Sequence, residues 1–282
     1  MTLSENGVFH GTEVGRDAPP VPGRHPVLVI SHGAGGNGGQ FGWLASRLVQ
    51  AGFVVVLPNH SGSTSGPARA AEALRIWERP QDISAVLDSL QGFPMVDPAR
   101  IGALGYSAGG YTFLTLAGAR VDPARLTSFC DRGGRGISDC AFFAQAGLDL
   151  HAQDLSPAAQ DLRDAHIRFV LAVDPGIVET LTRQSLAAID LPLLVINLGE
   201  EAKVPAPVHA RRVAETVPGA SYLVVPDAIH FSFLAECKPK GAAILAEEGE
   251  PDQLCSDAGG RTWAAIHADL LVVILPWVSN RW

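Results

Sequence analysis

The pentapeptide Gly-Tyr-Ser-Ala-Gly at residues 105–109 constrains this chain more than any other feature. It follows an apolar run at 100–104 and opens a segment, 110–119, that is predicted to be helical. Ser107 is therefore expected where a strand turns sharply into a helix. Such a turn strains the serine backbone and needs small neighbours, which the two glycines provide. The pentapeptide is a weak signal alone, but in a strand-turn-helix context it makes Ser107 a candidate nucleophile.

Strands and helices are predicted to alternate along the chain. Short runs rich in Val, Ile and Leu are typical of a parallel sheet that is covered on both faces. We expect strands near residues 27–31, 53–57, 101–106, 167–173, 192–197 and 221–226, and helices near 40–51, 68–91, 109–118, 206–216 and 261–274. This order predicts one α/β domain over residues 1–282 with a doubly wound, mostly parallel sheet.

Residues 120–165 interrupt that alternation with a polar, Gly-rich stretch followed by Phe142 and Phe143. We interpret this region as an insert that forms a cap over the functional site. A surface elaboration unrelated to substrate is the alternative.

A second glycine-rich loop, Ser-His-Gly-Ala-Gly-Gly at 31–36, follows the predicted strand at 27–31. Glycine-rich loops can hold phosphate groups. However, no Lys-Ser/Thr follows these glycines, and no Gly-x-Gly-x-x-Gly opens a helix with an acidic residue about twenty positions further on. The loop is therefore read as a source of backbone N–H groups beside Ser107, with His32 bracing it.

Among the nine histidines, His230 is the one that follows a late strand, in the segment Asp-Ala-Ile-His-Phe-Ser-Phe at 227–233. A histidine there fits the chain order Ser, acid, His of a nucleophile, its orienting acid and its general base. His60, directly after the strand at 53–57, could line a substrate pocket. Solvated or capping roles are expected for the others outside the 31–36 loop, namely His10, His25, His151, His166, His209 and His267.

Two positions compete for the acid. Asp174 ends the strand at 167–173, whereas Glu201, or its neighbour Glu200, follows the strand at 192–197. Either carboxylate could accept the imidazole N–H and stabilise an imidazolium. We favour Asp174, and the other carboxylate is then a solvated loop charge.

The segments 31–36, 53–60, 77–83, 105–109, 174–175 and 230–233 resemble the bacterial predicted dienelactone hydrolase group, which is similar to plasma-type platelet-activating factor acetylhydrolases. The resemblance extends over roughly residues 27 to 275 and implies the α/β-hydrolase fold. In the acetylhydrolases the acid follows the strand that corresponds to the one before Asp174, which supports that choice. True dienelactone hydrolases use a cysteine nucleophile, so the lactone substrate does not carry over to Ser107.

The resemblance implies a serine esterase with a Ser107, Asp174 and His230 triad and an acyl-enzyme intermediate. The N–H groups of Ala34 and Ala108 are expected to form the oxyanion hole. This chemistry requires no metal or organic cofactor. Apolar pocket walls could come from the aromatic residues Trp43, Trp77, Tyr106, Phe231 and Phe233.

Composition excludes several partner classes. The formal net charge is −8 and no basic run is present, which disfavours nucleic acid and anionic membrane surfaces. No apolar stretch is long enough to predict an integral membrane segment. The expected partner is a small-molecule or lipid-like ester. The oligomeric state is left open.

The four cysteines predict two loop-closing disulfides. Cys130 and Cys140 flank one polar segment, and Cys237 and Cys255 bound a loop that follows His230. Pairing of Cys130 with Cys140 and of Cys237 with Cys255 closes short loops and is favoured over the two other possible connectivities. Such bonds persist in oxidising compartments, so we expect a periplasmic or secreted protein whose precursor carries a signal peptide before residue 1. The alternative is a cytoplasmic protein with reduced thiols. No Cys-x-x-Cys or paired-His spacing indicates zinc.

Three functions remain open at this point: a carboxylesterase of lipase-like, acetylhydrolase-like or polyester-cleaving specificity, a serine peptidase or amidase, and a catalytically degenerate α/β-hydrolase that acts as a binding module. The esterase is favoured because three motifs stand in the required order. Acyl chain length, the alcohol and the use of phospholipids or polyesters depend on pocket geometry.

Overall fold

The computed structural model describes residues 1–66, 68–132, 138–202, 204, 208–249, 252–256 and 260–282. Its strands are β1 (Thr2–Leu3), β2 (Thr12–Glu13), β3 (His25–Ser31), β4 (Val54–Val56), β5 (Val96–Tyr106), β6 (Ile167–Val173), β7 (Leu193–Leu198) and β8 (Ser221–Val225). Its α-helices are α1 (Gly42–Gln50), α2 (Ala70–Ala73), α3 (Glu78–Leu90), α4 (Ala108–Leu116), α5 (Pro123–Thr127), α6 (Phe129–Arg132), α7 (Ser138–Gln145), α8 (Arg183–Ala187), α9 (Arg211–Thr216), α10 (Gly241–Glu247) and α11 (Trp263–Ser279). Short 3₁₀ turns include η1 (Gly38–Phe41), η3 (Leu150–Ala152), η4 (Ser156–Ala159), η5 (Val178–Thr180), η7 (His230–Phe233) and η8 (Asp252–Cys255).

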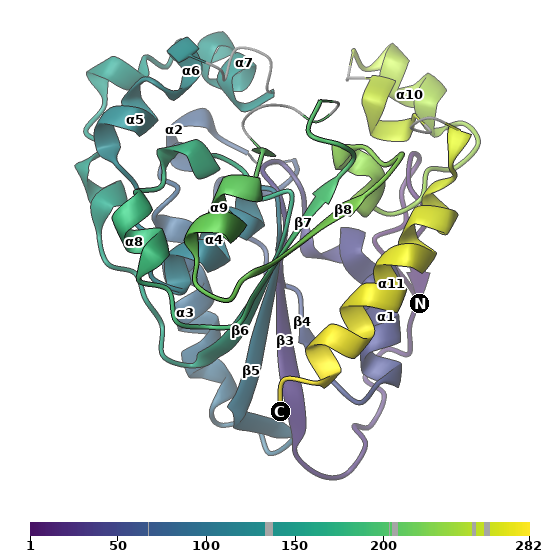
Figure 1. Ribbon diagram of the computed structural model, residues 1–282. Coiled ribbons are helices and arrows are strands. Elements are labelled where there is room, and N and C mark those ends of the chain that lie inside the picture. The colour runs from purple at the N-terminus through teal and green to yellow at the C-terminus, as the bar shows by residue number, and fades with distance from the viewer. Residues whose placement is uncertain (67, 133–137, 203, 205–207, 250–251, 257–259) are drawn as a thin grey trace.

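Six strands form one sheet in the order β4-β3-β5-β6-β7-β8, and every neighbouring pair is parallel. This confirms the predicted doubly wound α/β architecture. The register places the ends of three strands level, because Gly105 pairs with Ser31 on one side and with Ala172 on the other. Residues that follow β3, β5 and β6 therefore emerge at the same edge of the sheet, toward the top of Figure 1.

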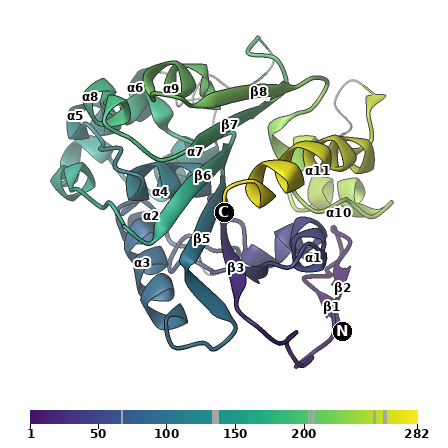
Figure 2. The same cartoon turned by 60° about the horizontal axis from the view of Figure 1, so that its bottom comes forward.

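Helices cover both faces of the sheet (Figures 1 and 2). Side chains alternate along each strand: in β3, Val27 and Val29 join the core under α3, α4, α8 and α9, whereas Leu28 and Ile30 join the core under α1 and α11. Because both faces are buried, the strands read as continuous apolar runs rather than as alternating patterns. The two cores hold the sheet rigid beneath the edge that carries the candidate site.

The predicted helix at 68–91 is wrong in one respect, because the structure divides it into α2 and α3 with a break at residues 74–77. Pro80 explains the break, since proline lacks an N–H and its ring collides with the carbonyl four residues earlier in a continuing helix. In the structure Pro80 lies in the first turn of α3, where no N–H is needed. The last helix, α11, runs past the predicted end at 274 and contains Pro276.

The described residues of 120–165 form α5, α6, α7, η3 and η4, and Phe143, Leu150 and Leu155 from this insert are buried in the core beside α3 and α4. The insert therefore packs onto the domain. In Figure 1, α7 stands on one side of the upper end of the sheet and α10, within the 237–255 loop, stands on the other. Both predicted disulfides are present, Cys130–Cys140 and Cys237–Cys255. The segments at 133–137, 250–251 and 257–259 lie outside the described residues.

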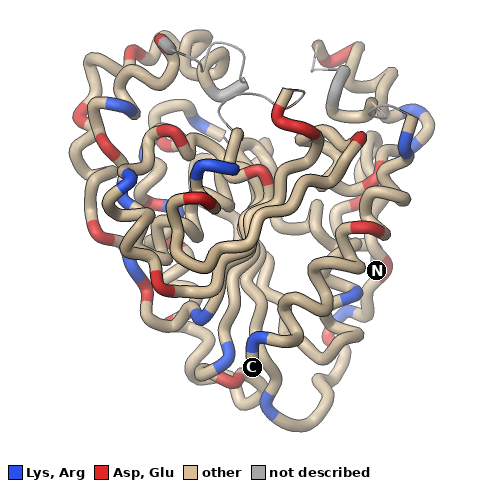
Figure 3. The backbone as a smooth tube through the Cα atoms, viewed as in Figure 1, with Lys and Arg blue, Asp and Glu red and all other residues tan. Residues whose placement is uncertain are grey.

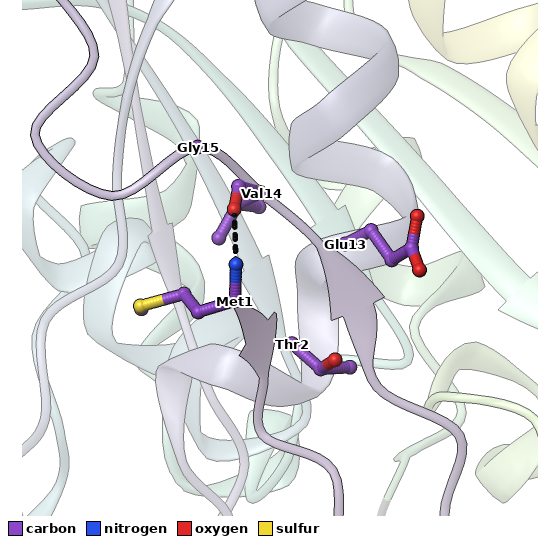
Figure 4. A pocket seen from close by; sticks show the side chains of 5 residues that line it. All are labelled: Met1, Thr2, Glu13, Val14 and Gly15. Atoms are coloured by element: carbon purple, nitrogen blue, oxygen red, sulfur yellow. Dashed lines mark hydrogen bonds between the residues drawn. The ribbon is translucent and has the colours of Figure 1, made fainter.

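Surface charges of both signs are interspersed over the molecule (Figure 3). Within the described part of the chain, no helix combines the length and the apolar character needed to cross a membrane. A cavity of about 460 Å³ lies on the N-terminal hairpin and is lined by Met1, Thr2, Glu13, Val14 and Gly15 (Figure 4). None of the predicted site residues lines it.

Candidate active site

Ser107 occupies a strained turn between β5 and α4. Its φ is +54° and its ψ is −121°, a conformation that side-chain-bearing residues rarely adopt. The flanking glycines allow it: a Cβ on Gly105 would lie 2.1 Å from the carbonyl oxygen of Gly109, and a Cβ on Gly109 would lie 2.0 Å from that of Ser31. The turn is fixed further because the N–H of Ser107 donates to the carbonyl of Val173, 3.0 Å away.

A continuous hydrogen-bonded chain joins Ser107, His230 and Asp174. The Oγ of Ser107 lies 3.2 Å from Nε2 of His230, and Nδ1 of the same ring lies 3.0 Å from Oδ2 of Asp174. Since a carboxylate can only accept, Nδ1 carries the proton and Nε2 is left free to accept from the serine hydroxyl. The structure thus brings together the three residues that the sequence suggested. Ser107 lies 123 positions before His230 in the chain, and Asp174 lies 56 positions before it.

Asp174 is fully buried and held by several donors. Its other oxygen, Oδ1, accepts from Nδ2 of Asn197 at 2.7 Å and from the N–H of Leu198 at 2.9 Å. These bonds stabilise an ionised carboxylate and leave Oδ2 for His230. Asp174 also has a positive φ, +41°, so both Ser107 and its proposed acid adopt strained backbone conformations at strand ends.

The competing acid, Glu201, lies away from this chain. It is exposed, with its carboxylate 3.4 Å from Arg211 and 3.8 Å from His209. Glu200 is also exposed. Glu201 therefore lies at the surface as a solvated loop charge, the role expected of the carboxylate that is not the acid.

Three ring side chains donate to three of the four carbonyls of η7, the turn that begins at His230. The hydroxyl of Tyr106 donates to the carbonyl of His230 at 2.8 Å, Nε2 of His267 to that of Ser232 at 2.9 Å, and Nε1 of Trp43 to that of Phe233 at 3.1 Å. His267 and Trp43 stack on each other with ring centroids 3.8 Å apart. The turn is therefore held from three directions.

His267 corrects one sequence-based interpretation, because it is buried rather than a surface residue. Only 5% of it is exposed, and burial lowers its pKa from 6.5 to about 4. The helical pattern of α11 contains the signal, since His267 shares the inward face with Trp263, Ile266 and Leu270.

The predicted aromatic walls divide into core and surface. Phe233 and Tyr106 are buried and pack against each other, Trp43 packs against Phe233, and Trp77 packs against the core beside α3. These four residues brace the domain. Phe231 is partly exposed and meets the His230 ring edge-on at a centroid distance of 5.3 Å. Tyr106 also lies beside His230, because its ring stacks on the imidazole with centroids 4.8 Å apart.

The two proposed oxyanion donors flank Ser107. Ala108 is the first residue of α4, and Gly33 lies so close that a Cβ there would be 3.1 Å from Cβ of Ser107, so the 31–36 loop packs against Ser107. Neither the N–H of Ala34 nor that of Ala108 donates to a backbone carbonyl among the described residues. Both remain available for a ligand oxygen.

His32 and His60 lie under this loop in a buried network. Nδ1 of His32 donates to the carbonyl of Gly33 at 2.6 Å, and its Nε2 accepts from the N–H of His60 at 3.3 Å. Burial, with the positive charge of Arg79, lowers the pKa of His32 to about 3 and that of His60 to about 2. His32 therefore braces the loop as a neutral ring. His60, although it borders a polar cavity of about 550 Å³ beside residues 59–64, has no exposed side-chain surface.

Sequence reasoning missed Arg79, Asp82 and Asn197 as site residues. Two of them had a signal: Arg79 sits four positions before Ile83 on the inward face of a helix, and Asn197 interrupts the apolar run of β7. A polar residue at a buried position requires hydrogen-bond partners. Among the described residues, no group of three or more His, Cys, Asp or Glu side chains is arranged to hold a metal ion.

Known proteins share parts of this sequence. The model of the prolyl oligopeptidase family matches residues 39–123. Protein YcjY of Escherichia coli is 40% identical over 93 residues, which is 32% of this chain and 30% of YcjY. Protein Rv2307c of Mycobacterium tuberculosis is 27% identical over 208 residues, 74% of this chain and 64% of Rv2307c. The chain thus matches less than two thirds of the length of either relative.

Solved structures share the whole architecture. A ferulic acid esterase from Streptomyces cinnamoneus superimposes with a TM-score of 0.59 at 17% identity, covering 94% of this chain and 69% of that one. A dienelactone hydrolase-like promiscuous phosphotriesterase from metagenomic libraries gives 0.53 at 16% identity, covering 93% and 88%. These likenesses and the parallel six-stranded sheet show that the chain has the α/β-hydrolase fold.

Proposed function

We propose that the protein is a serine hydrolase that cleaves carboxylic esters through Ser107. In this mechanism Nε2 of His230 takes the hydroxyl proton while Oγ attacks the ester carbonyl. The N–H groups of Ala34 and Ala108 donate to the oxygen that becomes negative. As the tetrahedral intermediate collapses, the imidazolium of His230 gives its proton to the departing alcohol. Water then attacks the acyl-enzyme by the same route and releases the acid.

Asp174 serves this mechanism without exchanging a proton. Its Oδ2 accepts the Nδ1–H of His230, which selects the tautomer whose Nε2 can act as a base and stabilises the imidazolium. The bonds from Asn197 and Leu198 keep this carboxylate in place.

One observation carries the proposal: an unbroken chain from a buried carboxylate through His230 to a serine held at φ +54°, assembled on the ends of parallel strands. A strained backbone is retained where the surrounding structure compensates for it, and such residues concentrate at active sites. A degenerate binding module would not require the three groups to remain aligned.

The proposed substrate is a small or lipid-like carboxylic ester. Phe231 supplies an apolar surface beside His230, and the insert at 120–165 and the 237–255 loop stand on either side of the sheet edge, which supports their role as walls of the substrate site (Figure 1). One of the structures with the same fold is named a ferulic acid esterase, which agrees with an ester substrate.

A serine peptidase is the second candidate, and the match of residues 39–123 to the prolyl oligopeptidase family favours it. A dipeptidyl peptidase 4 from Porphyromonas gingivalis also superimposes, with a TM-score of 0.50 over 92% of this chain. The same triad cleaves esters and amides, so the leaving group decides between the two.

The test compares p-nitrophenyl esters of graded acyl length with aminoacyl-nitroanilides, together with covalent labelling by a fluorophosphonate. We expect turnover of short or medium esters, labelling of one site, and loss of both in Ser107→Ala. Ser89→Ala, on the exposed side of α3, is the matched control and should behave as the wild type. Faster turnover of the anilides would favour the peptidase, and labelling that persists in Ser107→Ala would exclude Ser107 as the nucleophile.

The two disulfides support a location in the periplasm or outside the cell, since reducing compartments keep thiols free. Mass spectrometry of a non-reduced digest, from protein isolated in its native compartment, tests this. Four free thiols would contradict it.

A further inference from the structure

Arg79, on α3, is a buried cation with four hydroxyl or carbonyl contacts. It is 4% exposed. Its Nε donates to Oγ1 of Thr112 at 3.2 Å, and its Nη2 donates to Oγ of Ser31 at 3.3 Å and to the carbonyl of His32. Its Nη1 donates to Oγ of Ser63. One guanidinium therefore joins α3 to the end of β3, to the loop after β4 and to α4.

Two of these contacts lead to the two proposed oxyanion donors. Oγ1 of Thr112 accepts from Arg79 and donates to the carbonyl of Ala108 at 2.8 Å. The carbonyl of His32, which accepts from the same guanidinium, lies two residues before Ala34. One planar guanidinium thus connects the two backbone segments that carry these N–H groups.

A second Ser-His-Asp chain supports the same loop. The hydroxyl of Ser31 donates to Nε2 of His60 at 2.8 Å, and Nδ1 of His60 donates to Oδ2 of Asp82 at 2.9 Å. Ser31 is fully buried and accepts from Arg79, so it is closed to a substrate and serves as a support. The loop after β4 is tied in as well, because the N–H of Gly35 donates to the carbonyl of Ser63 at 3.0 Å.

The charge of Arg79 reaches this loop. After burial, it is the next largest cause that lowers the pKa values of His32 and His60. A positive charge that disfavours nearby imidazolium favours a nearby anion by the same field. In the proposed mechanism, the oxygen that becomes negative during ester cleavage accepts from the N–H of Ala34, which belongs to the same loop.

We propose that Arg79 is a positioning residue for the oxyanion hole, which sets the Ala34 and Ala108 N–H groups at the spacing that a tetrahedral intermediate requires and adds positive potential behind them. This inference rests on the proposed ester cleavage by Ser107. It predicts an effect on the transition state that exceeds the effect on substrate binding, because misplaced donors weaken the bonds that form as charge develops.

A pair of buried threonines on α4 provides the test. Thr112→Val removes the hydroxyl between Arg79 and Ala108. Thr115→Val is the control, since Thr115 is as buried as Thr112 and its hydroxyl donates to the carbonyl of Thr112 at 2.8 Å, whereas the hydrogen bond from Nε of Arg79 goes to Thr112. Thr112→Ser restores the hydroxyl. Arg79→Lys keeps the charge but cannot reproduce the fork of donors.

The readouts are kcat and KM on a p-nitrophenyl ester, the inhibition constant of a trifluoromethyl ketone, and the fraction of sites labelled by a fluorophosphonate. For Thr112→Val we expect kcat to fall about tenfold with little change in KM, and affinity for the ketone to fall by the same factor. Thr115→Val and Thr112→Ser should stay near the wild type. Arg79→Lys should lower kcat by about a hundredfold.

Two results would overturn the inference while ester cleavage by Ser107 stands. In the first, Thr112→Val and Thr115→Val have equal kcat per labelled site. In the second, the loss of activity in Thr112→Val is explained entirely by a smaller fraction of labelled sites. A wild type that turns over no ester would overturn the proposed function and the inference with it.

Discussion

The ring of Tyr106 stacks on the imidazole of His230 with centroids 4.8 Å apart, and its hydroxyl donates to the carbonyl of the same histidine at 2.8 Å. Tyr106 directly precedes the proposed nucleophile, so one residue of β5 positions the base while its neighbour supplies the attacking oxygen. The hydrogen bond is partly buried, and it links the end of β5 to a turn that lies 124 positions further along the chain.

Tyr106→Phe should therefore lower kcat several-fold and destabilise the fold by about 1 kcal/mol, because the ring stacking remains while one partly buried hydrogen bond is lost. Tyr111→Phe is the matched control. Tyr111 is also fully buried, but its hydroxyl has no hydrogen-bond partner among the described residues, so its removal should leave activity unchanged and stability equal or higher. Urea unfolding and ester kinetics on both variants measure the contrast. Equal losses in the two would contradict the role of the Tyr106 hydroxyl.

Asp174→Asn should reduce kcat by about 10³ to 10⁴, since an amide at this position no longer selects the Nδ1–H tautomer of His230. Glu201→Gln should change kcat little, because its exposed ion pair with Arg211 is distant from the proposed triad chain. Steady-state kinetics decide between them, with thermal unfolding to confirm that both variants fold. The reverse ranking would transfer the role of the acid to Glu201.

Acid should destabilise the fold through His267. The unfolded chain binds a proton at this residue near pH 6.5, whereas the folded chain binds one only near the lowered pKa of about 4. Between these values the unfolded state holds more protons, so stability falls as the pH falls, by roughly 1 kcal/mol per pH unit for this group. His267→Gln retains an N–H donor for the carbonyl of Ser232 without titrating, and its unfolding free energy should depend less on pH. Identical slopes for variant and wild type would refute this.

Removal of the Cys237–Cys255 disulfide, by Cys237→Ser with Cys255→Ser, should lower stability by about 3 kcal/mol, as expected for a loop of this length. Since this loop follows η7, we also expect kcat to fall. The corresponding double variant at Cys130 and Cys140 should lose comparable stability with a smaller effect on kcat. Thermal unfolding and kinetics under non-reducing conditions provide the comparison. A larger kcat loss in the second double variant would place the reacting groups closer to the insert at 120–165.

Local sequence determined the sheet and the nucleophile turn. The apolar runs at β3, β5, β6, β7 and β8 fix which segments are buried, and the two glycines around Ser107 permit a turn that few other residues tolerate. The helix break before Pro80 is equally local, because proline disfavours a helix that continues through its position. The prediction of one helix over 68–91 follows the apolar periodicity and neglects this proline. Such features depend on neighbours in the chain, so they can be read without the fold.

Tertiary structure decided which groups meet. Asp174 and Glu201 both follow strands, and only the packing of β6 beside β5 and β7 places one of them against His230 while the other lies in solvent. In the same way, the sequence predicts that Arg79 and His267 lie on helices, but not that Arg79 donates to the 31–36 loop and His267 to the turn of His230. These contacts join residues that lie tens of positions or more apart in the chain. Their geometry is set by the packing of both cores around the sheet, so it cannot be predicted from any short segment of the sequence.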